Sequence, residues 1–314
     1  MHRTDRAAWS VADIPSQRGR SAVVTGTGGL GYQDALALAR AGADVIIAGR
    51  NPSKGARAVA DIRQGVEEAI VRFEILDLAS LASVAAFKER LSASRDGIDL
   101  LVNNAAVMRP PRRLTTSDGF ELQFGTNYLG HFALTAHLLP LLRKGRLARI
   151  VNVSSIAARK GVIDFDDLQA ERRYRPSAAY RQSKLASLMF ALELQRLSEA
   201  SGWGLTSIAA HPGISATDLI ANGAGRMSAM GAARYLLGPI LFQSAARGAL
   251  ATLFAATSPN AEGGGYYGPD TLNELRGAPA PAKIPPQALN AHDAQRLWSL
   301  SERLCGMTFG PASR

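Results

Sequence analysis

Short apolar runs alternate with amphipathic stretches along most of this chain. An apolar run at 21–24 is closed by a glycine-rich turn, and a helical pattern follows over 32–41. The same alternation then repeats, with strands predicted at 44–48, 70–76 and 98–103 and helices predicted at 52–64 and 80–94. Such alternation predicts an α/β fold in which helices cover both faces of a parallel sheet and the crossovers are right-handed.

The remaining pattern predicts a single domain with two appendages. We expect an N-terminal arm at 1–19, a doubly wound (Rossmann) sheet of about seven strands at 20–270, and a C-terminal extension at 271–314. The later predicted elements are helices at 119–142, 177–200 and 244–257, a last strand at 264–269, a Pro- and Ala-rich linker at 271–286, and a final helix at 288–304.

The glycine turn Gly26-Thr27-Gly28-Gly29-Leu30-Gly31 lies between the first strand and the first helix. Glycine lets a backbone approach a pyrophosphate closely, and the free N–H groups at a helix N-terminus favour an anion. A glycine cluster can also be only a turn, but its place between strand and helix favours nucleotide binding.

The end of the second strand carries Gly49-Arg50-Asn51 and no carboxylate. An acidic residue at this place binds the adenosine ribose hydroxyls of NAD(H), whereas a basic residue suits the 2′-phosphate of NADP(H). The sequence therefore favours NADP(H), with NAD(H) as the alternative if Arg50 only contacts solvent.

Composition narrows the class of protein. The chain has 314 residues, 46% of them hydrophobic, and a formal net charge of +10. Its basic residues are dispersed without a recognised nucleic-acid motif, so we expect no nucleic-acid partner. The sequence has no apolar run long enough to span a membrane and no signal peptide, which predicts a cytoplasmic protein. One cysteine and five scattered histidines show no metal-ligand spacing.

Candidate chemistry lies between Ser154-Ser155, at the end of an apolar strand, and Tyr180 with Lys184. Positions 180 and 184 lie one turn apart on a helix, so the Lys184 ammonium is expected beside the phenol, where it would lower the pKa of Tyr180. The pair alone is a weak signal, because Tyr and Lys at this spacing are usually a ring covered by a solvated chain.

Several separated motifs follow one another along the chain. They are the glycine turn, Asp77, Asn103-Asn104-Ala105, Asn127, Ser155, Tyr180 with Lys184, and Pro212-Gly213. Together they resemble the short-chain dehydrogenase/reductase family, over residues 19–270. Two further stretches, Ser117–Glu121 with Asn127–Phe132 and Phe165–Leu168 with Arg173-Tyr174, are similar to its retinol-dehydrogenase-like branch, as is the long 159–176 insert.

The resemblance implies a role for each matching residue. Tyr180 would exchange a proton with the substrate oxygen, Lys184 would lower the pKa of Tyr180 and bind the nicotinamide ribose, and Ser155, rather than Ser154, would hold that oxygen. Asn127 would position a water. The implied cofactor-binding residues are Gly26, Gly28, Gly29, Leu30, Gly31, Arg50, Asp77, Leu78, Asn104, Ala105, Tyr180, Lys184, Pro212, Gly213 and Thr217.

Two features depart from the family pattern. The glycine turn, Gly26-x2-Gly29-x-Gly31, is one residue shorter than usual, and Ala106 stands where glycine is usual. His131 and His137 lie in an apolar helix and are interpreted as structural. The basic clusters Arg109–Arg113 and Arg172–Arg175 fit a solvated loop or an acidic substrate equally well.

The favoured function is an NADP(H)-dependent oxidoreductase that interconverts an alcohol and a ketone or aldehyde on a lipophilic or aromatic small molecule. A movable lid at 214–240 is expected to shape its pocket. The alternatives are an NAD(H)-dependent dehydrogenase, a catalytically silent nucleotide-sensing protein of the same fold, and a basic surface protein that binds lipid or nucleic acid. The resemblance also implies pairing of subunits through the helices at 119–142 and 177–200, as a homodimer or homotetramer, unless the insert or the C-terminal extension blocks it.

Overall fold

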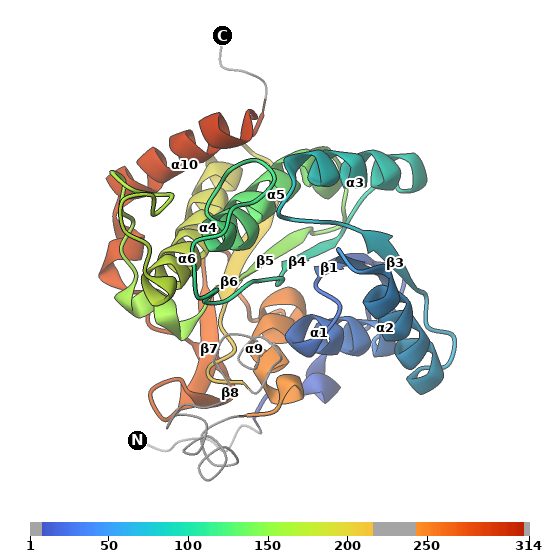
Figure 1. Ribbon diagram of the computed structural model, residues 1–314. Coiled ribbons are helices and arrows are strands. Elements are labelled where there is room, and N and C mark those ends of the chain that lie inside the picture. Colours follow the sequence, from blue (N-terminus) through green and yellow to red (C-terminus); the bar gives the residue numbers. More distant parts are fainter. Residues whose placement is uncertain (1–7, 216–242, 311–314) are drawn as a thin grey trace.

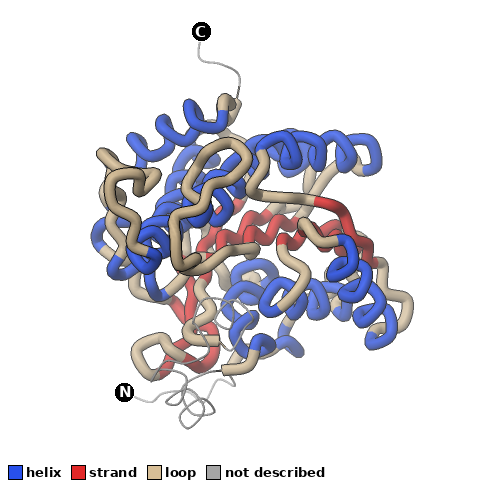
Figure 2. The backbone as a smooth tube through the Cα atoms, in the orientation of Figure 1, coloured by secondary structure: helices blue, strands red, loops and turns tan. Residues whose placement is uncertain are grey.

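An eight-stranded sheet runs through the centre of the molecule, between two layers of helices (Figures 1 and 2). The computed structural model describes residues 8–215 and 243–310. The strands are β1 (Ser21–Thr25), β2 (Asp44–Gly49), β3 (Val71–Ile75), β4 (Leu100–Asn103), β5 (Arg149–Val153), β6 (Thr206–Ala210), β7 (Tyr266–Thr271) and β8 (Arg276–Pro281). The helices are α1 (Gly29–Arg40), α2 (Pro52–Gly65), α3 (Leu81–Ser94), α4 (Leu122–Phe124), α5 (Gly130–Leu142), α6 (Pro176–Ala200), α9 (Ala245–Thr257) and α10 (Ala291–Cys305). The described residues also include four short helical segments: the 3-10 helices η1 (Val11–Asp13), η3 (Ile156–Lys160) and η4 (Pro286–Leu289), and the π-helical turn η2 (Gly125–Leu129).

The strand order β3-β2-β1-β4-β5-β6-β7-β8 confirms the predicted doubly wound fold. Strands β1 to β7 pair in parallel, and β8 pairs antiparallel with β7. Because β1 to β6 end at one edge of the sheet, the loops that follow them meet there, which is where such folds bind ligands. Among the described residues, no helix is long and apolar enough to cross a membrane.

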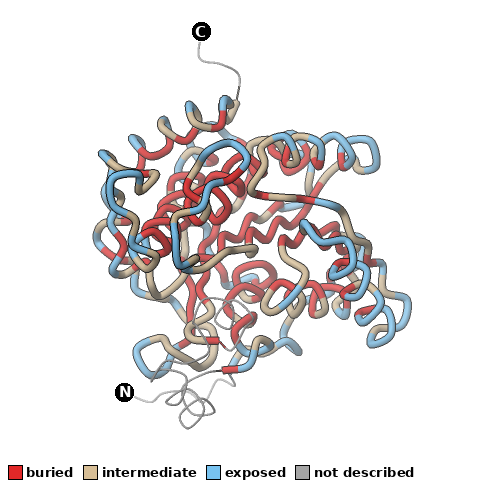
Figure 3. The backbone as a smooth tube through the Cα atoms, in the orientation of Figure 1, coloured by how far each residue is buried: buried red, intermediate tan, exposed pale blue. Residues whose placement is uncertain are grey.

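Burial explains why the strands read as continuous apolar runs. The central strands are covered on both faces, as Figure 3 shows in red. One apolar cluster lies between the sheet and α3, α5, α6 and α10, and a second lies between the sheet and α1, α2 and α9. Trp9, in the predicted N-terminal arm, packs edge-on against Phe254 of the second cluster with the ring centroids 5.4 Å apart.

Helix starts follow local capping chemistry. The Asn51 side chain accepts a hydrogen bond from the Lys54 N–H (3.0 Å) at the start of α2, which also has Pro52 in its first turn. Ser80 caps α3 in the same way through the Ser83 N–H (3.2 Å). These caps satisfy backbone donors that a helix start otherwise leaves unpaired, so the polar residues before each apolar stretch fix the boundaries.

The helix predicted at 119–142 is observed over 122–142, with one irregularity inside it. It begins at Leu122 as α4, passes through a π-helical turn at η2, and continues as α5. Gly130 joins the last two pieces, where a Cβ would lie 2.3 Å from the Leu78 carbonyl oxygen. The close approach of α5 to the loop after β3 therefore requires glycine at this position.

The predicted linker at 271–286 is wrong, because it contains β8. This strand pairs with β7 at the edge of the sheet, through a hairpin whose register is irregular between Pro269 and Thr271. Prolines 279 and 281 remove ladder donors, so the pattern gave no strand signal, yet an edge strand tolerates them. Residues 266–271 are consequently not the last strand of the sheet.

The C-terminal helix α10 covers α5 and α6. The Trp298 ring lies 5.2 Å from Phe132 and 5.7 Å from Phe190, and Phe309 lies 4.6 Å from Trp298. The Tyr128 hydroxyl is 2.6 Å from the Ser301 hydroxyl. An aromatic cluster therefore joins the C-terminal extension to the core of the domain.

Asp34 of α1 is fully buried, and neither of its carboxylate oxygens has a hydrogen-bond partner among the described residues. Burial raises the pKa of this carboxyl well above its ordinary value of 3.8. Between pH 3.8 and the folded-state pKa, the unfolded chain loses a proton that the folded chain keeps. The free energy of unfolding therefore falls as the pH rises from 3.8 to the folded-state pKa of Asp34.

We expect Asp34→Asn to match the wild-type melting temperature near pH 4 and to exceed it at pH 8 by about 2 °C or more, the shift that ~1 kcal/mol produces. Asn has nearly the same shape but cannot ionise. Thermal melts at both pH values, with the exposed Asp61→Asn as the control, test this. Parallel pH dependence in wild type and Asp34→Asn would show that Asp34 does not carry the effect.

Candidate active site

The carboxyl ends of the central strands bring the predicted site residues together. Parallel pairing places Asn103 of β4 beside Asn152 of β5, and Val153 beside Ala210 of β6. Ser155 follows β5 by two residues, and Pro212-Gly213 follow β6 by the same distance. Residues separated by more than 100 positions in sequence thus surround one edge of the sheet.

The glycine turn forms a close-packed bend with one open side. Gly26 and Gly29 have φ angles of +104° and +55°, which side chains disfavour. A Cβ on Gly31 would lie 2.5 Å from the Asn104 side-chain nitrogen, whereas a Cβ on Gly28 would meet nothing within 4 Å. The open side at Gly28 and the uncapped start of α1 fit an anion such as a pyrophosphate.

Asn104 and Ala105 pack against this turn. The Asn104 side chain donates to the Thr25 carbonyl (2.8 Å), and the backbone N–H groups of Asn104 and Ala105 donate to the Thr25 hydroxyl (2.9 and 3.0 Å). The Asn-Asn-Ala motif therefore fixes the glycine turn from the neighbouring strand. A shorter turn than is usual in such folds is held by these contacts.

The predicted adenosine-binding residues lie at the ends of β2 and β3. Arg50 is exposed directly after β2, and a Cβ on Gly49 before it would lie 2.8 Å from the Thr27 methyl group of the glycine turn. Asp77 accepts a hydrogen bond from the Ala79 N–H (3.0 Å), and Leu78 is buried. Arg50 therefore follows a residue that packs against the glycine turn, and its contact with a 2′-phosphate stays a prediction.

The two serines after β5 have different partners. Ser154 is buried, and its hydroxyl donates to the Lys184 carbonyl (2.7 Å), so it ties β5 to α6. Ser155 is partly exposed, its hydroxyl accepts from the Ala157 N–H (3.2 Å), and its interaction with the Tyr180 phenol lowers the pKa of that phenol. Of the two hydroxyls, Ser155 is the one placed to meet a substrate oxygen beside Tyr180.

Tyr180 lies in the first turns of α6 and is 6% exposed. Burial raises the pKa of its phenol, while the Ser155 hydrogen bond and the charge of Arg109 act in the opposite direction. The Arg109 guanidinium lies over the ring, 5.9 Å from its centroid. A phenol kept protonated in this way can donate a proton to a neighbouring oxygen.

Lys184 is buried one helical turn after Tyr180, as predicted, but its ammonium contacts the end of β5. Its Nζ donates to the Val153 carbonyl (2.8 Å), and burial lowers the pKa of Lys184 to about 8. The cation that lowers the pKa of Tyr180 in this structure is Arg109 and not Lys184. The expected effect of Lys184 on the phenol is therefore not seen in this conformation of its side chain.

Asn127 lies in the π-helical turn η2, where its side chain is bound by protein groups. The amide donates to the Val107 carbonyl and the Ser183 hydroxyl (both 3.0 Å), and its oxygen accepts from the Val107 N–H (2.7 Å). The buried His131 bonds the Asn127 carbonyl and the Thr25 hydroxyl (both 3.0 Å), and burial lowers the pKa of His131 to about 4. His131 is thus a satisfied neutral histidine, as expected, and the water-positioning role of Asn127 stays a prediction.

Pro212 and Gly213 form a tight turn after β6. Gly213 has a φ of +63°, and a Cβ there would lie 2.3 Å from the Leu275 carbonyl oxygen. The Pro212 carbonyl accepts hydrogen bonds from Ser215 (3.0 Å) and Gln243 (2.6 Å). Thr217 and the rest of the predicted lid from residue 216 lie outside the described residues.

The 159–176 insert contacts the loop that carries Arg109. The Tyr174 hydroxyl donates to the Pro110 carbonyl (2.9 Å), and the Gln169 side chain accepts from the Glu121 N–H (2.7 Å). Two hollows of about 430 and 550 Å³ are lined by the insert, α6 and the C-terminal region, and neither lining includes Ser155, Tyr180 or Lys184. The insert therefore borders the site through its contacts with the Arg109 loop.

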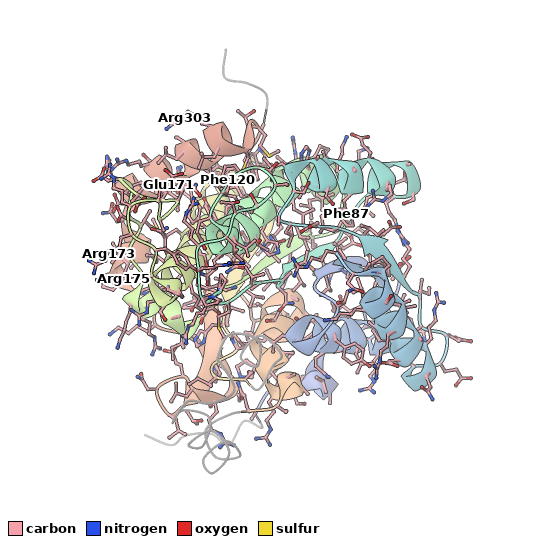
Figure 4. The ribbon with its side chains drawn as sticks, in the orientation of Figure 1. Phe87, Phe120, Glu171, Arg173, Arg175 and Arg303 are labelled. Carbon is pink, nitrogen blue, oxygen red and sulfur yellow. The ribbon has the colours of Figure 1, made fainter. Side chains whose placement is uncertain are left out.

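The two basic clusters have different surroundings. Arg173 and Arg175 are exposed at the outer edge of the molecule, on the side of α6 and α10 (Figure 4). Arg109 instead lies beside Tyr180, in a loop whose backbone is fixed by the Gln123 side chain (2.7 Å). The sequence named Arg109 only as part of a basic cluster, because its position depends on a left-handed backbone (φ +52°) that the pattern does not reveal.

Comparisons with known proteins agree with this arrangement. Residues 20–225, more than half of the chain, match the family model described as short chain dehydrogenase. The chain is 42% identical to retinol dehydrogenase 13 of Mus musculus, covering 97% of this chain and 88% of that protein. It is 40% identical to polyprenol dehydrogenase of Homo sapiens, covering 94% and 87% of the two chains.

A solved structure shares the whole architecture. It is described as a putative uncharacterized protein from Mycobacterium Paratuberculosis and is 38% identical to this chain. The two superpose with a TM-score of 0.80, over 97% of this chain and 100% of the other. The similarity therefore extends beyond the sheet to nearly the full length of the chain.

Proposed function

The chain belongs to the short-chain dehydrogenase/reductase family, in its retinol-dehydrogenase-like branch, and from that premise we propose an NADP(H)-dependent alcohol dehydrogenase or carbonyl reductase. The observation that carries the proposal is the contact between Ser155 and Tyr180 at the carboxyl edge of the sheet, next to the buried Lys184. The family assigns the reaction class, an oxidoreduction, and the site supplies the groups for its proton transfer.

The cofactor is expected along the sheet edge from Arg50 to Gly213. The open side of the turn at Gly28 and the free N–H groups of α1 would hold the pyrophosphate, and Asp77 with Leu78 would meet the adenine. Lys184 would hold the nicotinamide ribose, with Pro212-Gly213 beside the ring. When bound, the nicotinamide supplies or accepts the hydride.

The protein residues then handle the oxygen and its proton. In the reducing direction, Ser155 donates a hydrogen bond to the carbonyl oxygen and Tyr180 donates its phenolic proton to the same atom. Charge that develops on that oxygen is stabilised by both hydroxyls. The phenolate left behind is stabilised by the Arg109 guanidinium over its ring, and in the oxidising direction Tyr180 takes the proton back.

The substrate class follows from the relatives and from the residues after β4. Proteins named for retinol and polyprenol, both lipophilic isoprenoid alcohols, cover most of this chain at about 40% identity. The apolar run Ala105–Met108 follows β4 at the edge that carries Ser155 and Tyr180. These features support a lipophilic alcohol or its aldehyde as the substrate, and a screen of retinal, a prenyl aldehyde and aromatic ketones with NADPH tests it. If NADPH is oxidised in the presence of none of these compounds, this substrate class is contradicted.

NADP(H) preference is expected to depend on Arg50. Arg50→Asp removes the guanidinium directly after β2 and introduces a carboxylate, which would repel the 2′-phosphate and accept hydrogen bonds from ribose hydroxyls. The ratio of kcat/KM for NADPH to that for NADH should fall by about 10- to 100-fold, the value of a charge-assisted hydrogen bond.

The control for this prediction is Arg57→Asp on α2, which makes the same charge change at an exposed site where Arg57 pairs with Asp61. It should leave the ratio within about twofold of wild type, since exposed pairs contribute little. An equal change in both variants, or none in Arg50→Asp, would place phosphate recognition elsewhere and favour the NAD(H) alternative.

A further inference from the structure

Three side chains from distant parts of the chain are linked beside the Pro212-Gly213 turn. Arg159, in the η3 turn that begins directly after Ser155, pairs with the Glu274 carboxylate (2.5 Å). The other oxygen of Glu274 lies 2.8 Å from Nε2 of His211, the last residue before Pro212. Glu274 itself belongs to the hairpin between β7 and β8, so the contacts join the two loops that flank the site.

The hydrogen-bond donors assign the tautomer of His211. The Gly213 N–H donates to His211 Nδ1 (3.2 Å), so Nδ1 is an acceptor and Nε2 carries the proton that is donated to Glu274. His211 is fully buried, and burial lowers the pKa of its imidazole against the opposing effect of Glu274. A neutral His211 held by Glu274 therefore orients the backbone of Gly213.

The turn that carries Glu274 adopts an unfavourable backbone. Leu272, Asn273 and Glu274 have consecutive φ angles of +49°, +56° and +66°, a conformation that costs free energy for residues other than glycine. Its contacts offset that cost. Ile214 donates to the Leu275 carbonyl (2.9 Å), Arg159 donates to the Asn273 carbonyl (3.2 Å), and the Lys283 N–H donates to Glu274 (3.0 Å).

Both ends of this chain of contacts reach groups of the proposed site. At one end lies the Gly213 N–H. Gly213 has a left-handed backbone and lies close to the Leu275 carbonyl oxygen. At the other end, Arg159 lies in the η3 turn, and Ser155 is the N-cap residue of that turn. The Tyr266 ring lies against His211, with centroids 5.1 Å apart, and its hydroxyl donates to the Ser155 carbonyl (3.4 Å).

We propose that Arg159, Glu274 and His211 form a positioning relay that fixes the Gly213 backbone relative to Ser155 and so determines how the nicotinamide end of the cofactor is held. The relay rests on the proposed function, because that function assigns Pro212-Gly213 to the nicotinamide. The three are positioning residues and touch no reacting atom. The β7–β8 hairpin supplies Glu274 to the relay, and so has a role in the relay.

The test compares binding of the whole cofactor with binding of its adenosine half. In Glu274→Ala the acceptor for His211 is lost, so the affinity for NADPH should fall about tenfold while that for adenosine 2′,5′-bisphosphate stays within about twofold. Glu274→Gln keeps an acceptor for His211 and should bind NADPH within about threefold of wild type. Asp270→Asn, on the same hairpin but bonded to the Ala278 N–H, is the matched control and should bind both ligands as wild type does.

Two histidine variants carry the same test if Glu274→Ala does not fold. His211→Asn keeps an oxygen near Nδ1 for the Gly213 N–H, whereas His211→Gln keeps only a donor toward Glu274. Each variant thus breaks one of the two contacts of His211, so NADPH affinity should fall in both while the affinity for the bisphosphate stays within about twofold, and unchanged NADPH affinity in either variant would overturn the relay. Equal losses of both ligands in Glu274→Ala, or no loss of either, would overturn the relay alone. Failure of the wild type to bind NADPH and the bisphosphate would instead remove the proposed function, and the relay with it.

Discussion

Tyr180→Phe is expected to lower kcat by about 10³-fold while leaving the affinity for NADPH within about twofold of wild type. The change removes only the phenolic oxygen, and general acid–base groups contribute about 10²- to 10⁴-fold. The ring stays in its buried position under Arg109, so the cofactor-binding edge of the sheet is not altered. Steady-state rates and NADPH fluorescence titration of the same preparation measure the two quantities.

Tyr128→Phe is the matched control for this prediction. It also removes a buried phenolic hydroxyl, but that hydroxyl contacts Ser301 of α10, away from the site. We expect a modest loss of stability and a kcat within about twofold of wild type. Full activity in Tyr180→Phe would exclude the assigned proton transfer, and an equal loss in both variants would attribute the effect to folding.

Trp298→Ala is expected to lower the free energy of unfolding by about 3–5 kcal/mol, the usual cost of truncating a buried large aromatic residue. Trp298 contacts Phe132, Phe190 and Phe309, so its removal leaves a cavity where α10 meets α5 and α6. Urea denaturation followed by circular dichroism measures the change.

Ser299→Ala supplies the comparison for the tryptophan variant. Ser299 is the exposed neighbour of Trp298 on the same helix, and its truncation should change stability by less than about 0.5 kcal/mol. A loss below about 1 kcal/mol in Trp298→Ala would show that α10 contributes little to the stability of the domain.

The position of α10 also bears on subunit pairing. The family resemblance implies contacts between subunits through the helices that are α5 and α6 here, and α10 packs on both of them. A homodimer or homotetramer therefore stays a prediction, and it would have to accommodate α10 at that face or use another. The cytoplasmic location expected from the sequence stays a prediction as well.

Local signals were sufficient for most strands, most helices and the glycine turn. Strands β1, β2 and β4 are buried on both faces, so their apolar runs predict them directly, and Asn51 and Ser80 mark helix starts through their capping chemistry. Strand β8 could not be predicted in this way. Its prolines are unfavourable in most strands, and only its place at the edge of the sheet makes them acceptable.

The residues of the candidate site also differ in whether the local sequence predicts their positions. Ser155, Tyr180 and Lys184 are close because of one strand and one helix, and the sequence predicts both elements. Arg109 and Glu274 reach the site through left-handed loop residues, and no periodic pattern encodes such a conformation. The contact of Lys184 with Val153 likewise depends on the side-chain conformation rather than on the helical spacing.

Transfer of deuterium from labelled NADPH to a carbonyl compound distinguishes an oxidoreductase from a nucleotide-sensing protein. Wild-type protein would be incubated with NADPH deuterated at the reactive nicotinamide carbon and with retinal, a prenyl aldehyde or an aromatic ketone, and the alcohol product analysed by mass spectrometry. We expect an alcohol that carries one deuterium with wild type and almost none with Tyr180→Phe. Tight binding of NADPH without labelled alcohol from any of the carbonyl compounds would contradict it and favour the nucleotide-sensing alternative.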